Sequence, residues 1–359
     1  MVPLRPLVTG LGAVSAAGLG RTPLWDAVRH GKVCTGPVRR FAFPHPAGEV
    51  PPEVGLDVPA HRSLAARFLA AAVLEALGHA CVTSGRIGLF VGTVLADPRD
   101  LFDVVRAAVA LRGPAVLVGS GCAAGNDAIA LGANAVAADE VDVAICAGVD
   151  ELGPGTAAAF AGIGPLSPDV VRPFDAGRLG TLPAEGAGVL VLEHPRHLAA
   201  RGGTALAALA GHASTSDAHY RTRRTPFDGA VVDSLRRCLH RAGRRADQVD
   251  WLCAHGSGTR AGDAVEAVAA ASLGTPAVSS TKGALGHALG AAAALDAVVA
   301  VQALRAGFIP GNATLRHADT DLDLVEPAGR RAPVRLVLSP AFGLGGGVCT
   351  IALEAVDER

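Results

Sequence analysis

The amino-acid sequence predicts an α/β protein whose sheets are buried between helices, and three observations support this fold class. Apolar strand-like runs alternate with alanine-rich helical stretches. Hydrophobic residues make up 50% of the 359 residues and charged residues only 18%, so a large core can form without disulfides or a metal. A five-residue motif also occurs twice, each time at the start of an alanine-rich stretch.

The predicted elements follow one another without a linker that would separate two domains. Strands are expected in the short apolar runs and helices in the longer alanine-rich stretches. The 45 glycines are scattered among these residues, which suggests close packing of helices on sheets. In order, the sequence predicts a strand at 89–91, a helix at 99–111, a strand at 115–118, a helix at 123–138, and strands at 141–147 and 188–192.

The repeated motif reads GCAAG at 121–125 and GHALG at 286–290. Each copy follows a short strand-like run, at 115–119 in the first case and at 277–280 in the second. Two equivalent turns would then present Cys122 and His287 from related halves of one pseudo-symmetric body.

Charge and cysteine usage exclude several classes of protein. The formal net charge is −1 without long runs of one sign, so the basic surface of a nucleic-acid binder is missing. The seven cysteines are an odd number without metal-ligand spacing, and the chain does not start with a signal segment, which predicts a reduced cytoplasm. Apolar stretches such as 152–168 contain glycine and proline and fall short of the ~20 residues of a membrane span.

Cys122 is the candidate nucleophile. It lies between a strand-like segment and a helix, and the positive end of a helix stabilises a thiolate. A buried structural cysteine is the simpler reading for any one of seven, and it suits Cys146 and Cys349, which lie in apolar runs. Cys253, two residues before a histidine, remains ambiguous.

His255 ends the strand-like run 251–254, and two carboxylates follow it closely. A histidine there can donate a hydrogen bond to a developing enolate or thioester oxygen, although an isolated histidine is more often structural. Asp263 and Glu266 are interpreted as a helix-start cap and a supporting partner rather than as direct participants.

Lys282 and His287 lie five residues apart among small uncharged residues. Lys282 is conspicuous because 30 of the 32 basic residues are arginine. A buried charge in such a setting is costly unless it is paired, and Glu266 is a plausible partner.

These blocks, together with residues 8–15, 173–188 and 341–346, resemble in order the β-ketoacyl–acyl carrier protein synthases of the elongating type, over essentially the whole chain. The resemblance implies the thiolase fold, in which two similar halves pack as five αβαβα layers. The N-terminal half, 1–195, would carry the cysteine, and the C-terminal half, 196–359, would carry the two histidines and the lysine.

The resemblance also implies roles. Cys122 would accept the acyl group, while His255 and His287 would promote decarboxylation of a malonyl thioester, supported by Lys282 and Glu266. The backbone amides of Cys122 and Leu344 would form the oxyanion hole. Leu344 belongs to a closing loop that includes Gly343, Gly345 and Gly346. A metal or redox cofactor is not expected.

The implied partner is an acyl carrier protein with phosphopantetheine-bound acyl and malonyl groups. Candidate landing patches for this acidic partner are Arg62 with Arg67, or Arg221 with Arg223 and Arg224. A homodimer, or a heterodimer with a homologous subunit, is also expected.

Four departures from the usual family pattern favour type II polyketide or specialised fatty-acid biosynthesis. Leu344 stands where the family usually has a phenylalanine gate, Gly347-Val348 replaces Thr-Asn, Leu179 replaces an aspartate, and the segment before Cys122 is short. Two alternatives stay open: a non-elongating partner subunit that resembles chain-length factors, and a cysteine-dependent acyltransferase without decarboxylation.

The Leu344 gate generates a prediction about substrate choice. We expect Leu344→Phe to change the chain-length selectivity of acyl loading, because the larger side chain alters the gate over the acyl pocket. A competition between acyl donors of different length measures this selectivity, and an unchanged preference would argue against the gating role.

Overall fold

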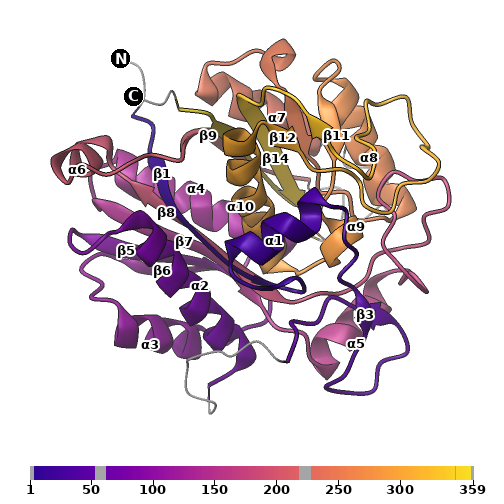
Figure 1. Cartoon of the computed structure of the whole chain (residues 1–359), viewed down its shortest axis with the longest axis horizontal. Coiled ribbons are helices and arrows are strands. Elements are labelled where there is room, and N and C mark those ends of the chain that lie inside the picture. The colour runs from indigo at the N-terminus through magenta and orange to yellow at the C-terminus, as the bar shows by residue number, and fades with distance from the viewer. Residues whose placement is uncertain (1–3, 53–61, 218–227, 344, 357–359) are drawn as a thin grey trace.

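The computed structural model describes residues 4–52, 62–217, 228–343 and 345–356. The first half of the chain forms a five-stranded sheet with the order β6-β5-β7-β8-β1 (Figure 1). Its parallel part is β6-β5-β7, and β8 and β1 are added in antiparallel pairing. The strands are β1 (Leu7–Ser15), β5 (Ile87–Gly92), β6 (Ala115–Val118), β7 (Val143–Asp150) and β8 (Gly186–Glu193).

The second half repeats this topology strand for strand. Its order is β11-β10-β14-β15-β9, with a parallel part β11-β10-β14 and antiparallel β15 and β9. The two sheets join where Leu7 and Val8 of β1 pair with Ala208 and Ala207 of β9. The strands are β9 (Ala207–Ser216), β10 (Trp251–Cys253), β11 (Ala277–Ser279), β14 (Leu336–Phe342) and β15 (Gly347–Glu354). The predicted pseudo-symmetric α/β fold is therefore confirmed.

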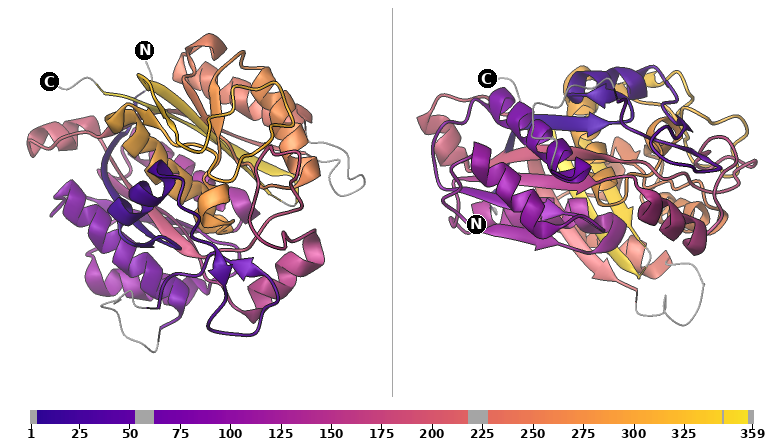
Figure 2. Two further views of the ribbon diagram at one scale, coloured as in Figure 1. Left: turned by 45° about the vertical axis from the view of Figure 1, so that its right-hand side comes forward. Right: turned by 90° about the horizontal axis from the view of Figure 1, so that it is seen from below.

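Three helices of each half occupy equivalent places and complete the layers. Helices α4 and α10 contact each other and strands of both halves, while α2 and α3 cover one outer side and α7 and α8 the other (Figures 1 and 2). Their bounds are α2 (Leu64–Ala80), α3 (Pro98–Ala108) and α4 (Ala124–Ala137) in the first half, and α7 (Asp228–Ala242), α8 (Arg260–Ala271) and α10 (Gly290–Ala306) in the second.

Smaller elements connect this framework. They are the helices α1 (Arg21–Arg29), α5 (Pro154–Ile163), α6 (Pro195–Ala200) and α9 (Lys282–Leu285), the short strands β2 (Gly18–Leu19), β3 (Gly36–Pro37), β4 (Pro46–Ala47), β12 (Phe308–Ile309) and β13 (Arg330–Arg331), and the 3₁₀ turns Gly121–Ala123 and Ala246–Gln248. None of the helices within the described ranges is long and apolar enough to cross a membrane.

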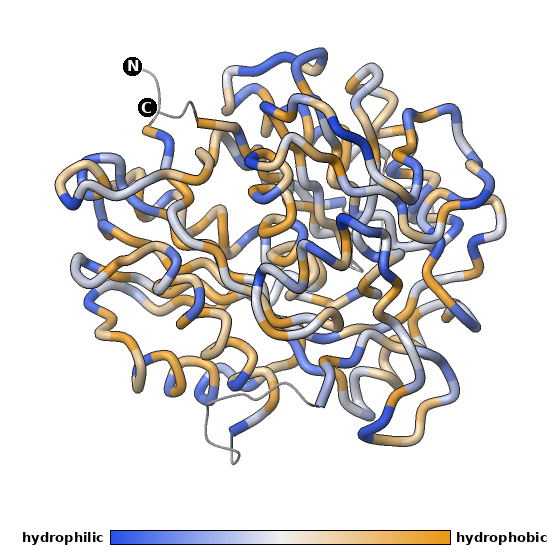
Figure 3. The backbone as a smooth tube through the Cα atoms, viewed as in Figure 1, coloured by the Kyte–Doolittle hydropathy of each residue, from blue (hydrophilic) through white to orange (hydrophobic). Residues whose placement is uncertain are grey.

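The alanine and glycine content is explained by the two central helices. A Cβ on Gly125 of α4 would lie 2.7 Å from the carbonyl oxygen of Gly290, and one on Gly188 of β8 would lie 2.5 Å from the backbone of Ala294 in α10. Small side chains therefore let α4 and α10 pack closely against each other and against the sheets. Apolar segments are accordingly concentrated in the central helices and strands (Figure 3).

The sequence-predicted elements agree with the structure to within a few residues. The strand predicted at 115–118 is β6, and the helix predicted at 123–138 is α4. The predicted division after residue 195 falls at the start of α6, between the last strand of the first half and the first strand of the second. As a domain boundary it stays a prediction.

Candidate active site

Cys122 lies in the 3₁₀ turn Gly121–Ala123 between β6 and α4. The φ angle of 69° at Gly121 makes this sharp turn possible without the strain that a side chain would cause. Cys122 is partly exposed, whereas Cys146, Cys238, Cys253 and Cys349 are buried. Burial of the thiol nevertheless raises the pKa of Cys122 to about 12, although the Lys282 charge lowers it.

The end of β14 brings the closing loop against Cys122. A Cβ on Gly343 would lie 2.9 Å from the Cys122 amide nitrogen, so a side chain at this position would press on the backbone of Cys122. The loop is held by backbone hydrogen bonds, in which Gly343 N–H donates to Gly347 (3.1 Å) and Gly346 N–H donates to Gly343 (3.2 Å). These bonds steady the loop although Gly347-Val348 lacks polar side chains. Leu344 lies outside the described residues.

The two histidines lie close together, and they come from segments that follow the neighbouring parallel strands β10 and β11. His255 follows β10 and His287 follows α9, and their ring centroids are 5.2 Å apart at an interplanar angle of 81°. The ring of Phe342, the residue before Gly343, lies 4.4 Å from that of His255. Cys122, the closing loop and the two histidines therefore form one continuous site.

The hydrogen bonding of His287 defines which ring nitrogen carries the proton. The Leu289 N–H donates to Nδ1 of His287 at 3.2 Å, so Nδ1 is an acceptor and the neutral ring carries its hydrogen on Nε2. Burial, with a contribution from Lys282, lowers the pKa of His287 to about 3 and the pKa of His255 well below its usual value. Both histidines are therefore neutral at neutral pH, and each neutral ring carries one N–H that can donate a hydrogen bond.

Glu266 supports His255 through the backbone. Its two carboxylate oxygens accept hydrogen bonds from the N–H groups of His255 and Gly256, each at 2.6 Å. Burial raises the pKa of Glu266 to about 8, although these two donors lower it. The carboxyl group of Glu266 thus fixes the chain where it leaves β10.

Asp263 is not the cap of α8, contrary to the sequence-based interpretation. The Thr259 side chain caps the helix by accepting from Gly262 N–H at 3.1 Å. Asp263 lies within the first turn, is buried, and accepts from Phe174 N–H (2.8 Å) and Gly258 N–H (3.0 Å). It therefore ties the segment before α8 to the segment around Phe174.

The predicted ion pair of Lys282 with Glu266 is wrong. The Nζ of Lys282 lies 3.1 Å from Asp296 Oδ2, and both side chains are almost fully buried, at 1% and 3% exposure. Thr281 Oγ1 also donates to Asp296 at 2.5 Å. Asp296 comes from α10, so the pair links α9 to the central helix next to His287. The sequence contained a signal for this pair, since Asp296 is the sole acidic residue in the otherwise small and apolar start of α10.

Two phenylalanines were also missed by the sequence analysis. Phe342 contacts His255, and Phe160 of α5 contacts the edge of His287 with ring centroids 5.8 Å apart. Nothing in the sequence around Phe160 distinguishes it from a core residue. Together these rings surround the histidine pair with apolar surface.

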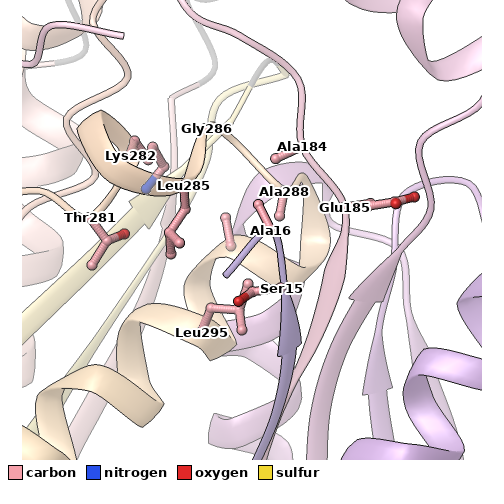
Figure 4. Close-up of a pocket in the computed structure, with 11 residues that line it drawn as sticks. Ser15, Ala16, Ala184, Glu185, Thr281, Lys282, Leu285, Gly286, Ala288 and Leu295 are labelled. Carbon is pink, nitrogen blue, oxygen red and sulfur yellow. The ribbon is translucent and has the colours of Figure 1, made fainter. Parts of the chain in front are cut away.

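A cavity of about 10 Å³ lies beside Lys282, between the end of β1, α9 and the start of α10 (Figure 4). Ser15, Thr281, Lys282 and Leu285 are among the residues that line it. Such a volume has room for about one water molecule and not for an acyl chain. Among the residues that the structure describes, no cluster of three or more His, Cys, Asp or Glu side chains could hold a metal ion.

The arginines predicted to bind a carrier protein are only partly placed. Arg62 pairs with Asp100 at 2.8 Å and lies 3.8 Å from Asp103, so its charge is balanced locally. Arg67 is half-buried, and its Nε has no hydrogen-bond partner within the described ranges. Arg221, Arg223 and Arg224 fall outside the described residues. The carrier-binding role of these arginines stays a prediction.

Comparison with known proteins gives consistent similarities. Residues 104–197 match the family described as beta-ketoacyl synthase, N-terminal domain, and residues 206–316 match beta-ketoacyl synthase, C-terminal domain. The chain is 32% identical to nodulation protein E of Rhizobium meliloti (strain 1021) over 402 aligned residues, covering 98% of this chain and 99% of that protein. It is 29% identical to the putative polyketide beta-ketoacyl synthase 1 of Streptomyces halstedii, covering 99% of both.

Solved structures show the same fold. The ishigamide ketosynthase/chain length factor superposes with a TM-score of 0.94 at 29% identity, covering 99% of this chain and 100% of that one. A chain from the complex AntDE:AntF, a type II polyketide synthase acyl-carrier protein with its ketosynthase bound to the hexaketide, superposes with a TM-score of 0.89 at 25% identity and the same coverage.

The Lys282–Asp296 pair generates a stability prediction. We expect Asp296→Ala to lower the free energy of unfolding by about 3–5 kcal/mol, because it leaves the Lys282 ammonium buried without its counter-charge. The double variant Lys282→Met/Asp296→Leu is expected to recover most of this loss, since both charges are then absent. Urea unfolding followed by the fluorescence of Trp25 and Trp251 measures both.

Asp233→Ala is the matched control for this prediction, because Asp233 forms an exposed pair with Arg237 at 3.7 Å. A loss for Asp296→Ala no larger than that of the control would contradict the role given to the buried pair.

Proposed function

Because this chain belongs to the β-ketoacyl synthase family, we propose that it is an active acyltransferase that carries an acyl group on Cys122 and extends it by decarboxylative condensation with a malonyl-type carrier thioester. The proposed setting is type II polyketide or specialised fatty-acid biosynthesis. The observation that carries the proposal is the site itself: a partly exposed cysteine at a helix start beside two buried, neutral histidines whose rings are 5.2 Å apart.

In the first step, the sulfur of Cys122 attacks the carbonyl carbon of the incoming acyl thioester and the carrier thiol leaves with a proton. Since the pKa of Cys122 is about 12, the thiol gives up its proton as the bond forms. The start of α4 and the nearby Lys282 charge favour the developing thiolate. The backbone amides of Cys122 and Leu344 are the proposed donors to the tetrahedral oxyanion.

In the second step, the two histidines donate hydrogen bonds to the thioester oxygen of the malonyl group. The electron pair of the carbon–carboxylate bond then forms an enolate and carbon dioxide is released. A neutral N–H donor suits this step, because its hydrogen bond strengthens as negative charge develops on the oxygen. The apolar rings of Phe160 and Phe342 keep this charge development in a water-poor setting.

In the third step, the enolate carbon attacks the acyl carbonyl on Cys122. The tetrahedral intermediate collapses, the Cys122 sulfur leaves as a thiolate that takes up a proton from water, and a β-ketoacyl thioester two carbons longer remains on the carrier. The enzyme returns to its starting state without a net change in oxidation, so this chemistry can run on the residues of the chain alone.

The two alternatives make different use of the same residues. A non-elongating subunit that resembles chain-length factors has no use for the nucleophile, yet this chain retains Cys122 with His255 and His287 around it. An acyltransferase that does not decarboxylate needs no pair of N–H donors for an enolate. The neutral histidine pair therefore favours the condensing enzyme over both.

The free side of β6 supports the proposed pairing with a second copy or a homologous subunit. Among the residues that the structure describes, β6 ends the sheet order, and all four of its residues are apolar and half-exposed. The carbonyl of Pro114 accepts a hydrogen bond from β5, and that of Val118 accepts one from Thr93, the residue after β5. By strand alternation, the N–H of Leu117 therefore points away from β5. Such a strand is a template for pairing with another chain. Because β6 leads directly to Cys122, the partner would lie next to the acyl site.

Acyl loading tests the catalytic proposal. We expect intact-protein mass spectrometry to show an acyl adduct on the wild type and none on Cys122→Ala after incubation with a panel of acyl-carrier donors. Addition of malonyl carrier is expected to discharge the adduct as a β-ketoacyl product two carbons longer. His287→Ala serves as the second comparison, since it is expected to load the acyl group but to lose condensation by about 100-fold or more.

Failure of every donor to load Cys122, even with a homologous chain present, would favour the partner-subunit alternative. Loading followed by transfer without release of carbon dioxide would favour the non-decarboxylating acyltransferase.

The β6 pairing generates a separate prediction. We expect Leu117→Pro to shift the protein toward monomers, because proline removes the outward N–H without removing a bond to β5. Leu117→Ala is the matched control, since it shortens the side chain and keeps the N–H. Light scattering coupled to size-exclusion chromatography measures the mass, and the same mass for wild type and Leu117→Pro would exclude pairing through β6.

A further inference from the structure

Asp150 is a buried carboxylate that the roles described so far do not use. It is the last residue of β7 and is 0% exposed. Its oxygens accept hydrogen bonds from Thr93 Oγ1 (2.8 Å), from Leu95 N–H (3.0 Å) and from Val94 N–H (3.0 Å) in the first half, and from Gly290 N–H (2.8 Å) in the second. Asp150 therefore joins the ends of β5 and β7 to the first residue of α10.

The fit at this junction is close. A Cβ on Gly290 would lie 2.8 Å from Asp150 Oδ2 and 2.9 Å from the Cα of Thr93. Since α10 begins at Gly290, the carboxylate occupies the position at which it satisfies a free N–H and interacts with the positive end of the helix. The charge of Asp150, in the first half of the chain, thus acts on the start of α10 in the second half.

The residue before Gly290 is strained, and it contacts the catalytic histidine. Leu289 has φ 53° and ψ −124°, a conformation that residues with a side chain rarely adopt. In this conformation the Leu289 N–H donates to Nδ1 of His287. The strained backbone of Leu289 thus keeps its N–H on Nδ1 of His287, which leaves the ring hydrogen on Nε2. Such strain persists only where the surroundings hold both ends of the turn.

We propose that Asp150 is a positioning residue for decarboxylation, which holds Gly290 so that the strained Leu289 keeps His287 in the Nε2–H form. This inference rests on the proposed function for its kinetic part, and on geometry alone for the ring tautomer. Asp150 itself does not touch the reacting atoms; it acts through Gly290 and Leu289.

The proposed role of Asp150 affects decarboxylation at His287 and leaves acyl loading of Cys122 largely unchanged. Loss of Asp150 removes the restraint on the His287 turn, whereas the Cys122 turn keeps its own contact with Gly343. Besides burial, the Asp150 charge raises the pKa of Cys122, so its removal does not disfavour the thiolate that acyl loading needs. Asp150→Asn retains the shape but places an amide NH₂ group against N–H donors, so at least one of the four hydrogen bonds is lost. Asp150→Ala removes all four.

The experiment measures acyl loading of Cys122 and release of carbon dioxide from malonyl carrier on the full chain. We expect Asp150→Asn to keep the loading rate within about threefold of the wild type and to lower decarboxylation by about tenfold or more. Asp150→Ala is expected to lower decarboxylation further. An equal loss in both half-reactions, or no loss in either, would overturn the proposal.

Asp175→Asn is the matched control. Asp175 is also buried, and its side-chain oxygens accept hydrogen bonds from the backbone N–H groups of Gly177, Arg316 and His317. The control is expected to leave the ratio of decarboxylation to loading unchanged, so a shift in this ratio in both variants would point to a general structural effect and overturn the assignment.

A spectroscopic measurement tests the geometry without turnover. In ¹⁵N-histidine-labelled protein, the His287 signals, identified by their absence in His287→Ala, are expected to show an acceptor Nδ1 and a protonated Nε2. Asp150→Asn is expected to shift them toward a mixture of tautomers, and unchanged signals would overturn the proposal even if both half-reactions slow. If the wild type neither loads nor decarboxylates, the proposed function fails while this tautomer measurement still decides the role of Asp150.

Discussion

The contact between α4 and α10 is the constraint on which the rest of the structure depends. The two helices begin at equivalent turns, and their first residues approach so closely that a Cβ on Gly125 would lie 2.7 Å from Gly290 O. Because the helices start side by side, the residues just before them, Cys122 and His287, are brought together from distant parts of the chain. The same small residues allow each helix to contact strands of both halves. The high alanine and glycine content is thus explained by the close packing of these two helices.

Much of the fold could be predicted from the sequence because its signals are local. Short apolar runs between alanine-rich stretches predicted β6 with its observed bounds and α4 with one extra residue at each end. The repeat around Cys122 and His287 predicted two related halves, which the identical strand orders confirm. The motif around His255 also predicted a histidine at a strand end, since the strand-like run before it is three residues of β10. The same local motifs carried the resemblance to the family.

The partners of the buried charges could not be predicted, because tertiary packing decides them. Glu266 and Asp296 were equally available to Lys282 by residue type, but Glu266 is occupied by the N–H groups that follow β10, and α10 brings Asp296 to the lysine. Phe160 carries no signal, since its role depends on where α5 lies relative to His287. The positive φ of Leu289 is likewise invisible in the sequence, because leucine at a helix start predicts ordinary backbone.

The strand order also has a consequence for how the chain is made. In each half, the first strand pairs with a strand that is synthesised much later. β1 lies between β8 and β9, and β9 lies between β1 and β15, the last strand in the described part of the chain. A nascent chain that has not yet released Gly347–Glu354 from the ribosome therefore exposes one long side of β9. Until β15 emerges, the second sheet lacks the link between β14 and β9, and an unpaired strand edge of this kind promotes association between incomplete chains. The second sheet is therefore completed only after β15 has been synthesised.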